Sequence, residues 1–169
     1  MSHTLPRTVK RAVALGLSVC AALGLGACSN DKDLADASAF GAGAATPGSA
    51  QDFVVNIGDR VFFESDSTDL TPTATAILDK QAAWLQRYPR YTFIIEGHAD
   101  ERGTREYNFS LGARRAQAVN DYLATRGIAG NRMRTVSYGK ERPVAVCNDI
   151  SCWSQNRRAV IVLDRGAGA

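Results

Sequence analysis

Acidic residues are absent from the first 30 positions of this sequence, and the stretch Ala12–Ala27 carries no charge of either sign. The residues before that stretch include Arg7, Lys10 and Arg11. A basic start followed by a short apolar run is typical of a secretory signal. The run is shorter than the ~20 residues that a membrane-spanning helix needs. We therefore predict that residues 1–27 form a signal peptide that is removed on export.

The apolar run ends in the motif LGAC, Leu25–Cys28. Small residues directly before a cysteine resemble the bacterial lipobox, which implies cleavage before Cys28 and covalent attachment of lipid to that residue. The first acid, Asp31, does not directly follow Cys28. By the rule for such lipoproteins, this favours the periplasmic face of the outer membrane. An ordinary signal peptide cut nearby and a single-span anchor are the alternatives.

A net positive charge is also missing once the signal is removed. Three of the 20 basic residues precede Cys28 and none of the 17 acids do, so 17 of each remain. Binding to nucleic acid therefore loses its electrostatic basis. The same balance gives no indication of a polybasic patch for a membrane surface.

Histidine and cysteine are both scarce after residue 28. His98 is the one histidine there, so a metal centre is poorly supplied. Cys147 and Cys152 remain, and an even pair in an exported protein predicts a disulfide. A metal pair is the alternative, and it would need two further ligands. We expect no metal and no cofactor apart from the lipid on Cys28.

Composition divides the rest of the chain into three parts. Residues 28–51 are rich in Ala, Gly, Ser and Asp, which predicts a lipidated cysteine followed by a flexible tether. Residues 52–165 are long enough for one compact domain, and residues 166–169 are predicted to be a disordered tail.

Periodicity within residues 52–165 alternates between strand and helix. The order predicts an α/β (α+β) two-layer sandwich with helices on one face of a mixed sheet. Thr71 and Pro72 are a predicted cap and first position of a helix, and Gly127 a predicted helix end. Trp84 has the spacing of a core residue. Strands are predicted at 52–63, 90–97, 133–139 and 159–164, and a break of the first near Gly58 is the alternative. Helices are predicted at 71–89 and 105–128, with a helical turn at 151–158.

Acidic side chains gather where the strand at 90–97 ends. A pair of catalytic carboxylates of the glycosidase type is one hypothesis. A metal site is another, because alternation puts three potential ligands on one side of the strand. Nearby arginines, which we expect to lie mostly in a solvated loop, would keep the acids ionised, which suits binding better than general acid catalysis. The potential metal ligands are Glu96, His98 and Asp100, the third acid is Glu101, and the arginines are Arg102 and Arg105.

A second feature lies on the helix that follows. Asn108, Leu111 and Arg115 share one helix face, with Arg115 near its apolar edge. A partly buried guanidinium needs an acid or a bound carboxylate. The loop after Asp100 turns back into this helix, so the two charges should meet. They could form an internal salt bridge, or Asp100 could hold an ammonium and Arg115 a carboxylate of one zwitterion.

Three motifs carry a family resemblance. The segments GHADERGTREYNFSLGARRAQAVNDYLATRGI, TVSYGKERP and SQNRRAV resemble the OmpA-like peptidoglycan-binding domain over residues 60–163. Within that family they are most similar to the peptidoglycan-associated lipoproteins of the Tol–Pal system. The family pattern Asn-x-x-Leu-(Ser/Gly)-x-x-Arg-Ala is met by Asn108, Leu111, Gly112, Arg115 and Ala116. The loop with Cys147 and Cys152 departs from the best-known members.

The resemblance implies a βαβαβ(β) fold and a function without catalysis. That function is non-covalent binding of peptidoglycan through the meso-diaminopimelate of its stem peptide, tying the outer membrane to the cell wall. It also implies partnership with the Tol proteins TolB and TolA in envelope integrity and cell division. An envelope hydrolase and an OmpA-like module of another assembly are the rival hypotheses. The implied ligand-binding residues are Phe63, Asp66, Asp69, Leu70, Asp100, Asn108, Arg115 and Arg157, with His98 in a supporting position.

Overall fold

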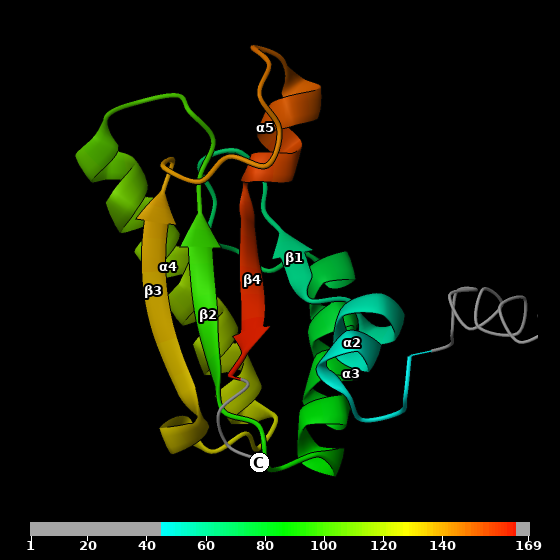
Figure 1. The fold of residues 1–169 in the computed structure, drawn as a ribbon. Coiled ribbons are helices and arrows are strands. Elements are labelled where there is room, and N and C mark those ends of the chain that lie inside the picture. The colour runs from blue at the N-terminus through cyan, green and yellow to red at the C-terminus, as the bar shows by residue number, and fades with distance from the viewer. Residues whose placement is uncertain (1–44, 165–169) are drawn as a thin grey trace, which may run out of the picture. The chain divides into compact units, whose positions relative to one another are not determined.

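The computed structural model describes residues 45–164 and contains a four-stranded sheet. The spatial order of the strands is β1 (Arg60–Phe62), β4 (Arg158–Leu163), β2 (Phe93–His98) and β3 (Met133–Gly139). β4 is antiparallel to both β1 and β2, whereas β2 and β3 are parallel. Figure 1 shows the sheet face-on, with β3 and β1 at its two edges.

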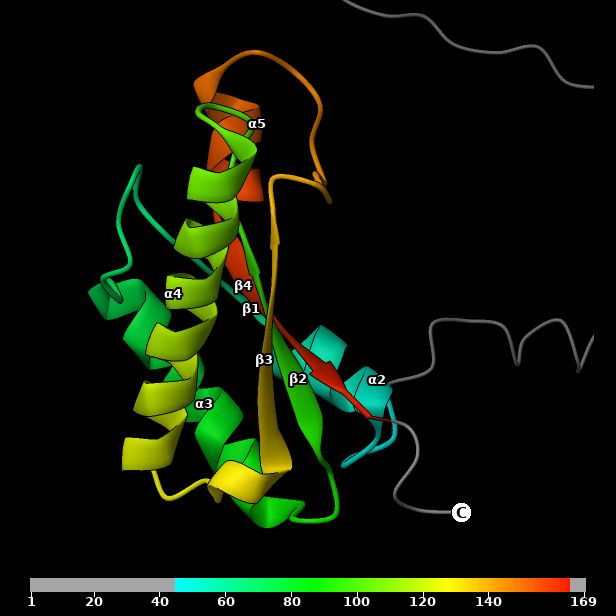
Figure 2. The ribbon, with the colours of Figure 1, turned by 90° about the vertical axis from the view of Figure 1, so that its left-hand side faces the viewer.

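Two long helices cover one face of this sheet. They are α3 (Pro72–Arg87) and α4 (Arg105–Thr125), and Figure 2 shows both on the same side. Apolar side chains of the helices and of alternate strand positions fill the space between the layers. The predicted two-layer α/β sandwich is therefore confirmed. The largest of these apolar residues that are almost completely buried are Phe53, Leu78, Leu85, Phe93, Ile95 and Leu123.

The predicted ends of the helices are also confirmed. Thr71 caps α3 by accepting a hydrogen bond from the backbone of Ala74 at 3.1 Å, and Pro72 occupies the first turn. Thr104 caps α4 in the same way. Gly127 follows α4 with φ of +83°, a conformation that glycine adopts without steric cost.

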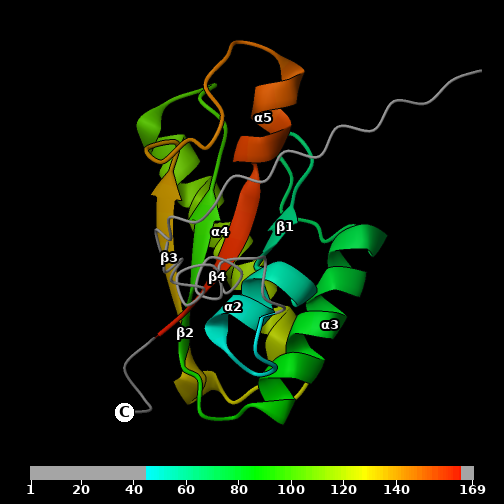
Figure 3. The ribbon, with the colours of Figure 1, turned by 45° about the vertical axis from the view of Figure 1, so that its right-hand side comes forward.

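The strand predicted over residues 52–63 is wrong for its first half. Residues there form α2 (Ala50–Asp52) and a π-helical turn, η2 (Phe53–Ile57), and only β1 is extended. Phe53 is fully buried against Trp84, with ring centroids 4.9 Å apart. Figure 3 shows this helical segment beside α3. Packing on α3 therefore overrides the β-branched composition of the segment.

The end of the predicted tether also belongs to this folded unit. The carboxylate of Asp52 accepts hydrogen bonds from the indole of Trp84 and from the backbone of Gly48, both at 2.8 Å. The carbonyl of Gly48 accepts from Arg90 and Tyr91. Residues 45–51 are thus fastened to the domain. Cys28 and residues 29–44 lie outside the described residues.

A close approach of two glycines sets the distance between α4 and the sheet. A side chain on Gly97 would overlap the carbonyl oxygen of Gly112, and one on Gly112 would meet the Ser137 hydroxyl. Helix α4 therefore lies directly on β2 at the point where β2 ends, and the segment after β2 faces the first turns of α4. Within the described residues, no helix is both long and apolar enough to cross a membrane.

Candidate ligand-binding site

A small pocket lies where β2 ends and α4 begins. Its volume is about 220 Å³. We call it the Asp100 pocket. Four of the eight predicted ligand-binding residues line it, namely Asp66, Asp100, Asn108 and Arg115. The remaining lining residues are Ser65, Arg102, Gly103, Tyr107 and Leu111.

The carboxylate of Asp100 has two cationic neighbours. Arg102 donates to it from Nε at 3.0 Å and from Nη2 at 2.6 Å, and Arg157 approaches to 3.4 Å. Burial raises the pKa of Asp100, but the hydrogen bonds from Arg102 and Arg157 outweigh burial, so the pKa lies below its ordinary value. Asp100 is therefore a carboxylate at neutral pH, on one wall of the pocket.

Arg115 is completely buried on another wall. Its guanidinium donates to the backbone carbonyls of Ser67 at 2.9 Å, His98 at 2.8 Å and Glu64 at 3.0 Å. These bonds use three of its five N–H groups. Burial and then the charge of Arg157 lower the pKa of Arg115 to about 10, so the group stays charged at neutral pH. The internal Asp100–Arg115 salt bridge is not among the ion pairs of the described residues.

Arg115 also shapes the loop after β1. Its three carbonyl contacts join that loop to the end of β2, and the ring of Phe63 lies 5.2 Å from its guanidinium carbon. Asp66 in this loop has φ of +56° and accepts a hydrogen bond from the hydroxyl of Tyr107 on α4. Phe63 is buried behind the Asp100 pocket and does not line it.

Asn108, which lines the Asp100 pocket, and Arg157, which does not, both support its walls. The side-chain amide of Asn108, which is buried, donates to the carbonyl of Arg102 at 2.7 Å. Arg157 donates from Nε to the carbonyl of Phe63 at 3.0 Å and reaches Asp100 with its other end. Both side chains fix the two loops that form the walls.

Two of the predicted contact residues lie elsewhere. Asp69 is exposed, and its backbone N–H is bonded to the Ser67 hydroxyl. Leu70 packs against the apolar core just before α3. The chain has turned away from the pocket at this point to enter the cap of α3, so neither residue lines the Asp100 pocket.

Arg102 is a pocket residue that the sequence prediction assigned to a solvated loop. Its guanidinium stacks on the ring of Trp153 in α5 (Ile150–Asn156) at 4.2 Å, and Trp153 donates to Glu101. The predicted disulfide is confirmed between Cys147 and Cys152, beside Trp153 in the chain. A buried acid two residues before an arginine is the signal that could have indicated the Arg102 contact.

His98 is buried, and neither ring nitrogen has a hydrogen-bond partner. Burial, followed by the charges of Arg158, Arg142 and Arg60, lowers its pKa to about 4. His98 is therefore neutral at pH 7. Among the described residues, the three ligand-type side chains that converge are Cys147, Asp149 and Cys152, whose two cysteines are disulfide-bonded. The proposed metal ligands Glu96, His98 and Asp100 do not converge in this way.

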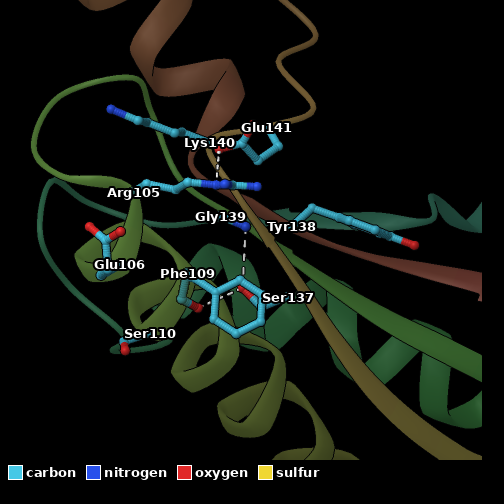
Figure 4. A pocket seen from close by; sticks show the side chains of 9 residues that line it. All are labelled: Arg105, Glu106, Phe109, Ser110, Ser137, Tyr138, Gly139, Lys140 and Glu141. Carbon is cyan, nitrogen blue, oxygen red and sulfur yellow. Dashed lines mark hydrogen bonds and ion pairs between the residues drawn. The ribbon is translucent and has the colours of Figure 1, made fainter.

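A larger pocket of about 680 Å³ lies on the other side of α4, against the end of β3. We call it the Phe109 pocket. Figure 4 shows the ring of Phe109 in the open beside Ser137, and an ion pair between Arg105 and Glu141 at 3.0 Å. The ring of Tyr138 points away from these side chains (Figure 4). Glu106, Ser110, Gly139 and Lys140 complete the lining.

The fold and the Asp100 pocket, with an acid and a buried arginine at one strand-to-helix corner, define a small α/β module suited to binding a ligand. The sequence profile of the OmpA family matches residues 62–157, and the chain belongs to this family. The resemblance inferred from the motifs is therefore confirmed.

Curated relatives point to one branch of that family. Peptidoglycan-associated lipoproteins of Rhizobium meliloti and Agrobacterium fabrum are 65% and 58% identical to this chain. The first match covers 87% of this chain and 85% of the relative, and the second covers 90% and 88%. These names denote lipoproteins and not enzymes, which agrees with the prediction of a binding protein.

Solved structures agree with this assignment. The crystal structure of the peptidoglycan-associated lipoprotein from Burkholderia pseudomallei is 42% identical, with a TM-score of 0.61 over 63% of this chain and 90% of that one. The C-terminal domain of Helicobacter pylori MotB, at 24% identity and a TM-score of 0.60, shares the fold.

Proposed function

We propose that this protein binds peptidoglycan without cleaving it, through the meso-diaminopimelate residue of the stem peptide. The observation that carries the proposal is the meeting of Asp100 and Arg115 in one pocket of about 220 Å³. The side-chain end of diaminopimelate is a zwitterion, with an ammonium and a carboxylate on one carbon. A site with an ionised acid and a charged arginine on its walls complements both groups.

The size and electrostatics of the pocket support this ligand. A volume of that order accommodates one amino-acid end group and not a whole disaccharide peptide. Two N–H groups of Arg115, which lines the pocket, remain beyond its three carbonyl contacts. Asp100 has its pKa held low, so it would attract an ammonium and would not act as a general acid.

Calorimetry with two stem peptides tests the proposal. One peptide carries diaminopimelate, and the other carries lysine, which has the ammonium but lacks the carboxylate beside it. We expect measurable affinity for the first and at least about tenfold weaker binding of the second, because the Arg115 contact is lost. Equal binding of both would exclude the two-ended recognition, and release of muropeptides from cell walls would support the hydrolase instead.

A matched pair of variants tests the residues. Asp100→Asn removes the charge while keeping the shape, and we expect it to abolish most of the affinity. Asp69→Asn removes an exposed charge of the same loop region that does not line the pocket. Asp69→Asn should bind the stem peptide like the parent protein. Loss of affinity in Asp69→Asn but not in Asp100→Asn would overturn the assignment of Asp100 to the site.

The proposed attachment to the membrane depends on Cys28. We propose that lipid on Cys28 holds the chain at the periplasmic face of the outer membrane, with residues 29–44 as the tether. α2, near the start of the described chain, and the end of β2 lie toward opposite ends of the domain (Figure 1), and residues that follow β2 line the Asp100 pocket. A pull on the tether would therefore not act directly on the pocket walls. Labelling with radioactive palmitate and membrane fractionation, with Cys28→Ala as the control, test this anchor.

The same proposal includes the Tol proteins. We propose that TolB competes with peptidoglycan for this end of the domain, and that exchange between them, together with TolA, operates during cell division. Titration of TolB into the protein with and without saturating stem peptide tests the competition. An unchanged affinity for TolB would contradict a shared surface.

A further inference from the structure

The Phe109 pocket lies directly across α4 from the Asp100 pocket. The two hollows use opposite faces of the first turns of one helix, which is about 10 Å across. Gly103, in the loop before α4, lines the Asp100 pocket, and Arg105, the first residue of α4, lines the Phe109 pocket. Lys140 fastens that loop by donating to the carbonyls of Glu101 at 3.1 Å and Gly103 at 2.7 Å.

The charges of the Phe109 pocket balance. Two cations, Arg105 and Lys140, face two acids, Glu106 and Glu141, and one of the four possible pairs is the Arg105–Glu141 ion pair. A pocket of this composition has no net attraction for an anion or a cation. It offers hydrogen-bond donors and acceptors in similar number, together with the hydroxyl of Ser110. The matching ligand is polar and uncharged.

An exposed aromatic ring completes the pocket. Phe109 is 56% exposed although it belongs to a helix whose other face is buried. Its own carbonyl accepts a hydrogen bond from the Ser137 hydroxyl at 2.6 Å, which fixes the backbone under the ring (Figure 4). An open aromatic face beside hydroxyl and carboxylate groups suits a hexose, because the axial C–H groups of a sugar stack on the ring while its hydroxyls bond at the rim.

We infer that the Phe109 pocket is a second subsite, which takes an N-acetylated sugar of the glycan strand whose stem peptide occupies the Asp100 pocket. The inference rests on the proposed function. When the stem peptide of a glycan strand occupies the Asp100 pocket, the sugar that carries the peptide is only a few residues' length from the Phe109 pocket. At about 680 Å³, the second pocket has room for the ring that the first excludes.

Calorimetry with three probes tests the subsite: the free stem peptide, the same peptide joined to its disaccharide, and the disaccharide alone. The purified protein should bind the disaccharide-linked peptide roughly fivefold to tenfold more tightly than the free peptide, which is the range expected for one stacked ring. Phe109→Ala should remove that advantage and leave the affinity for the free peptide unchanged. Phe109→Trp should retain it.

The control is Phe62→Ala, another exposed phenylalanine, on the opposite edge strand β1 and outside both pockets. It should keep the full advantage of the disaccharide. The inference is overturned if the parent protein binds the disaccharide-linked peptide no more tightly than the free peptide. It is also overturned if Phe109→Ala retains that difference in affinity, or lowers the affinity for both peptides equally. Failure of the free peptide itself to bind would instead refute the proposed function, so the two failures are distinguishable.

Discussion

The guanidinium of Arg102 donates two hydrogen bonds to the carboxylate of Asp100, from Nη2 to Oδ2 at 2.6 Å and from Nε to Oδ1 at 3.0 Å. Arg102 is partly exposed and stacks on Trp153, whereas Asp100 is nearly buried. The position that an incoming ammonium would take is thus held by a cation of the protein itself. Binding of a zwitterion at Asp100 then requires Arg102 to move aside.

The first prediction follows from this contact. Arg102→Gln should strengthen binding of the diaminopimelate stem peptide roughly twofold to fivefold, because the ligand's ammonium no longer has to displace the guanidinium from Asp100. Titration calorimetry at 0.05 M and 0.15 M salt measures the change. Weaker binding by the variant would mean that Arg102 contacts the ligand rather than competing with it.

The second prediction concerns Arg115. Arg115→Lys keeps the charge but can satisfy fewer of the three carbonyls that the guanidinium now bridges. We expect the free energy of unfolding to fall by about 2–4 kcal/mol and the stem peptide to bind more weakly. Urea denaturation and calorimetry give the two values.

The matched control is the neighbouring arginine. Arg114 is exposed on the same helix, and Arg114→Lys should change the free energy of unfolding by less than about 0.5 kcal/mol. If Arg115→Lys is equally mild, the carbonyl contacts do not hold the loop as the structure indicates.

Features that depend on residues close together in the chain could be predicted from the sequence. Such local signals predicted the Thr71 cap of α3, the glycine that ends α4, and the partly buried position of Arg115 close to the segment after β2. The helical segment before β1 did not follow, because it depends on the bond between Asp52 and Trp84, 32 residues apart. A run such as FVVNI favours a strand until that distant contact is known.

Part of the lining of the Asp100 pocket was also predictable from local sequence patterns. Asp100, Asn108 and Arg115 came from a helix period and a short connection, and Asp66 came with them from the family pattern. The stacking of Arg102 on Trp153 could not be predicted, because Trp153 approaches from α5, an element that the sequence does not link to this loop. Asp69 does not line the Asp100 pocket, because the chain turns there into the cap of α3.

The third prediction concerns the contact between Gly97 and Gly112. Gly97 has no positive φ, so its role is the close packing of α4 on β2 and not a turn. Gly97→Ala should lower the free energy of unfolding by about 3 kcal/mol or more, since the added methyl overlaps backbone that cannot move alone. Thermal denaturation checks the value. Gly130→Ala, at a position with open space and no positive φ, is the control and should be nearly neutral.

The fourth prediction is a pH dependence that comes from His98. Burial and the charges of Arg158, Arg142 and Arg60 lower its pKa from 6.5 to about 4 in the folded protein. In the unfolded chain His98 takes up a proton as the pH falls below about 6.5, whereas in the folded protein it does so only near pH 4. His98 therefore destabilises the fold progressively between pH 6.5 and 4, by on the order of 3 kcal/mol in total.

His98→Phe isolates this effect, because the ring next to Tyr138 is kept and the titration is removed. The difference in free energy of unfolding between the parent and the variant should change by on the order of 3 kcal/mol from pH 7 to pH 4, in favour of the variant. Titration of carboxylates elsewhere affects both proteins equally and cancels. Urea denaturation at several pH values gives the curve. A constant difference would show that the pKa of His98 is the same in the folded and the unfolded protein. A change in favour of the parent would show that His98 is protonated in the fold and paired with Glu96, whose carboxylate lies 3.5 Å from its Nε2.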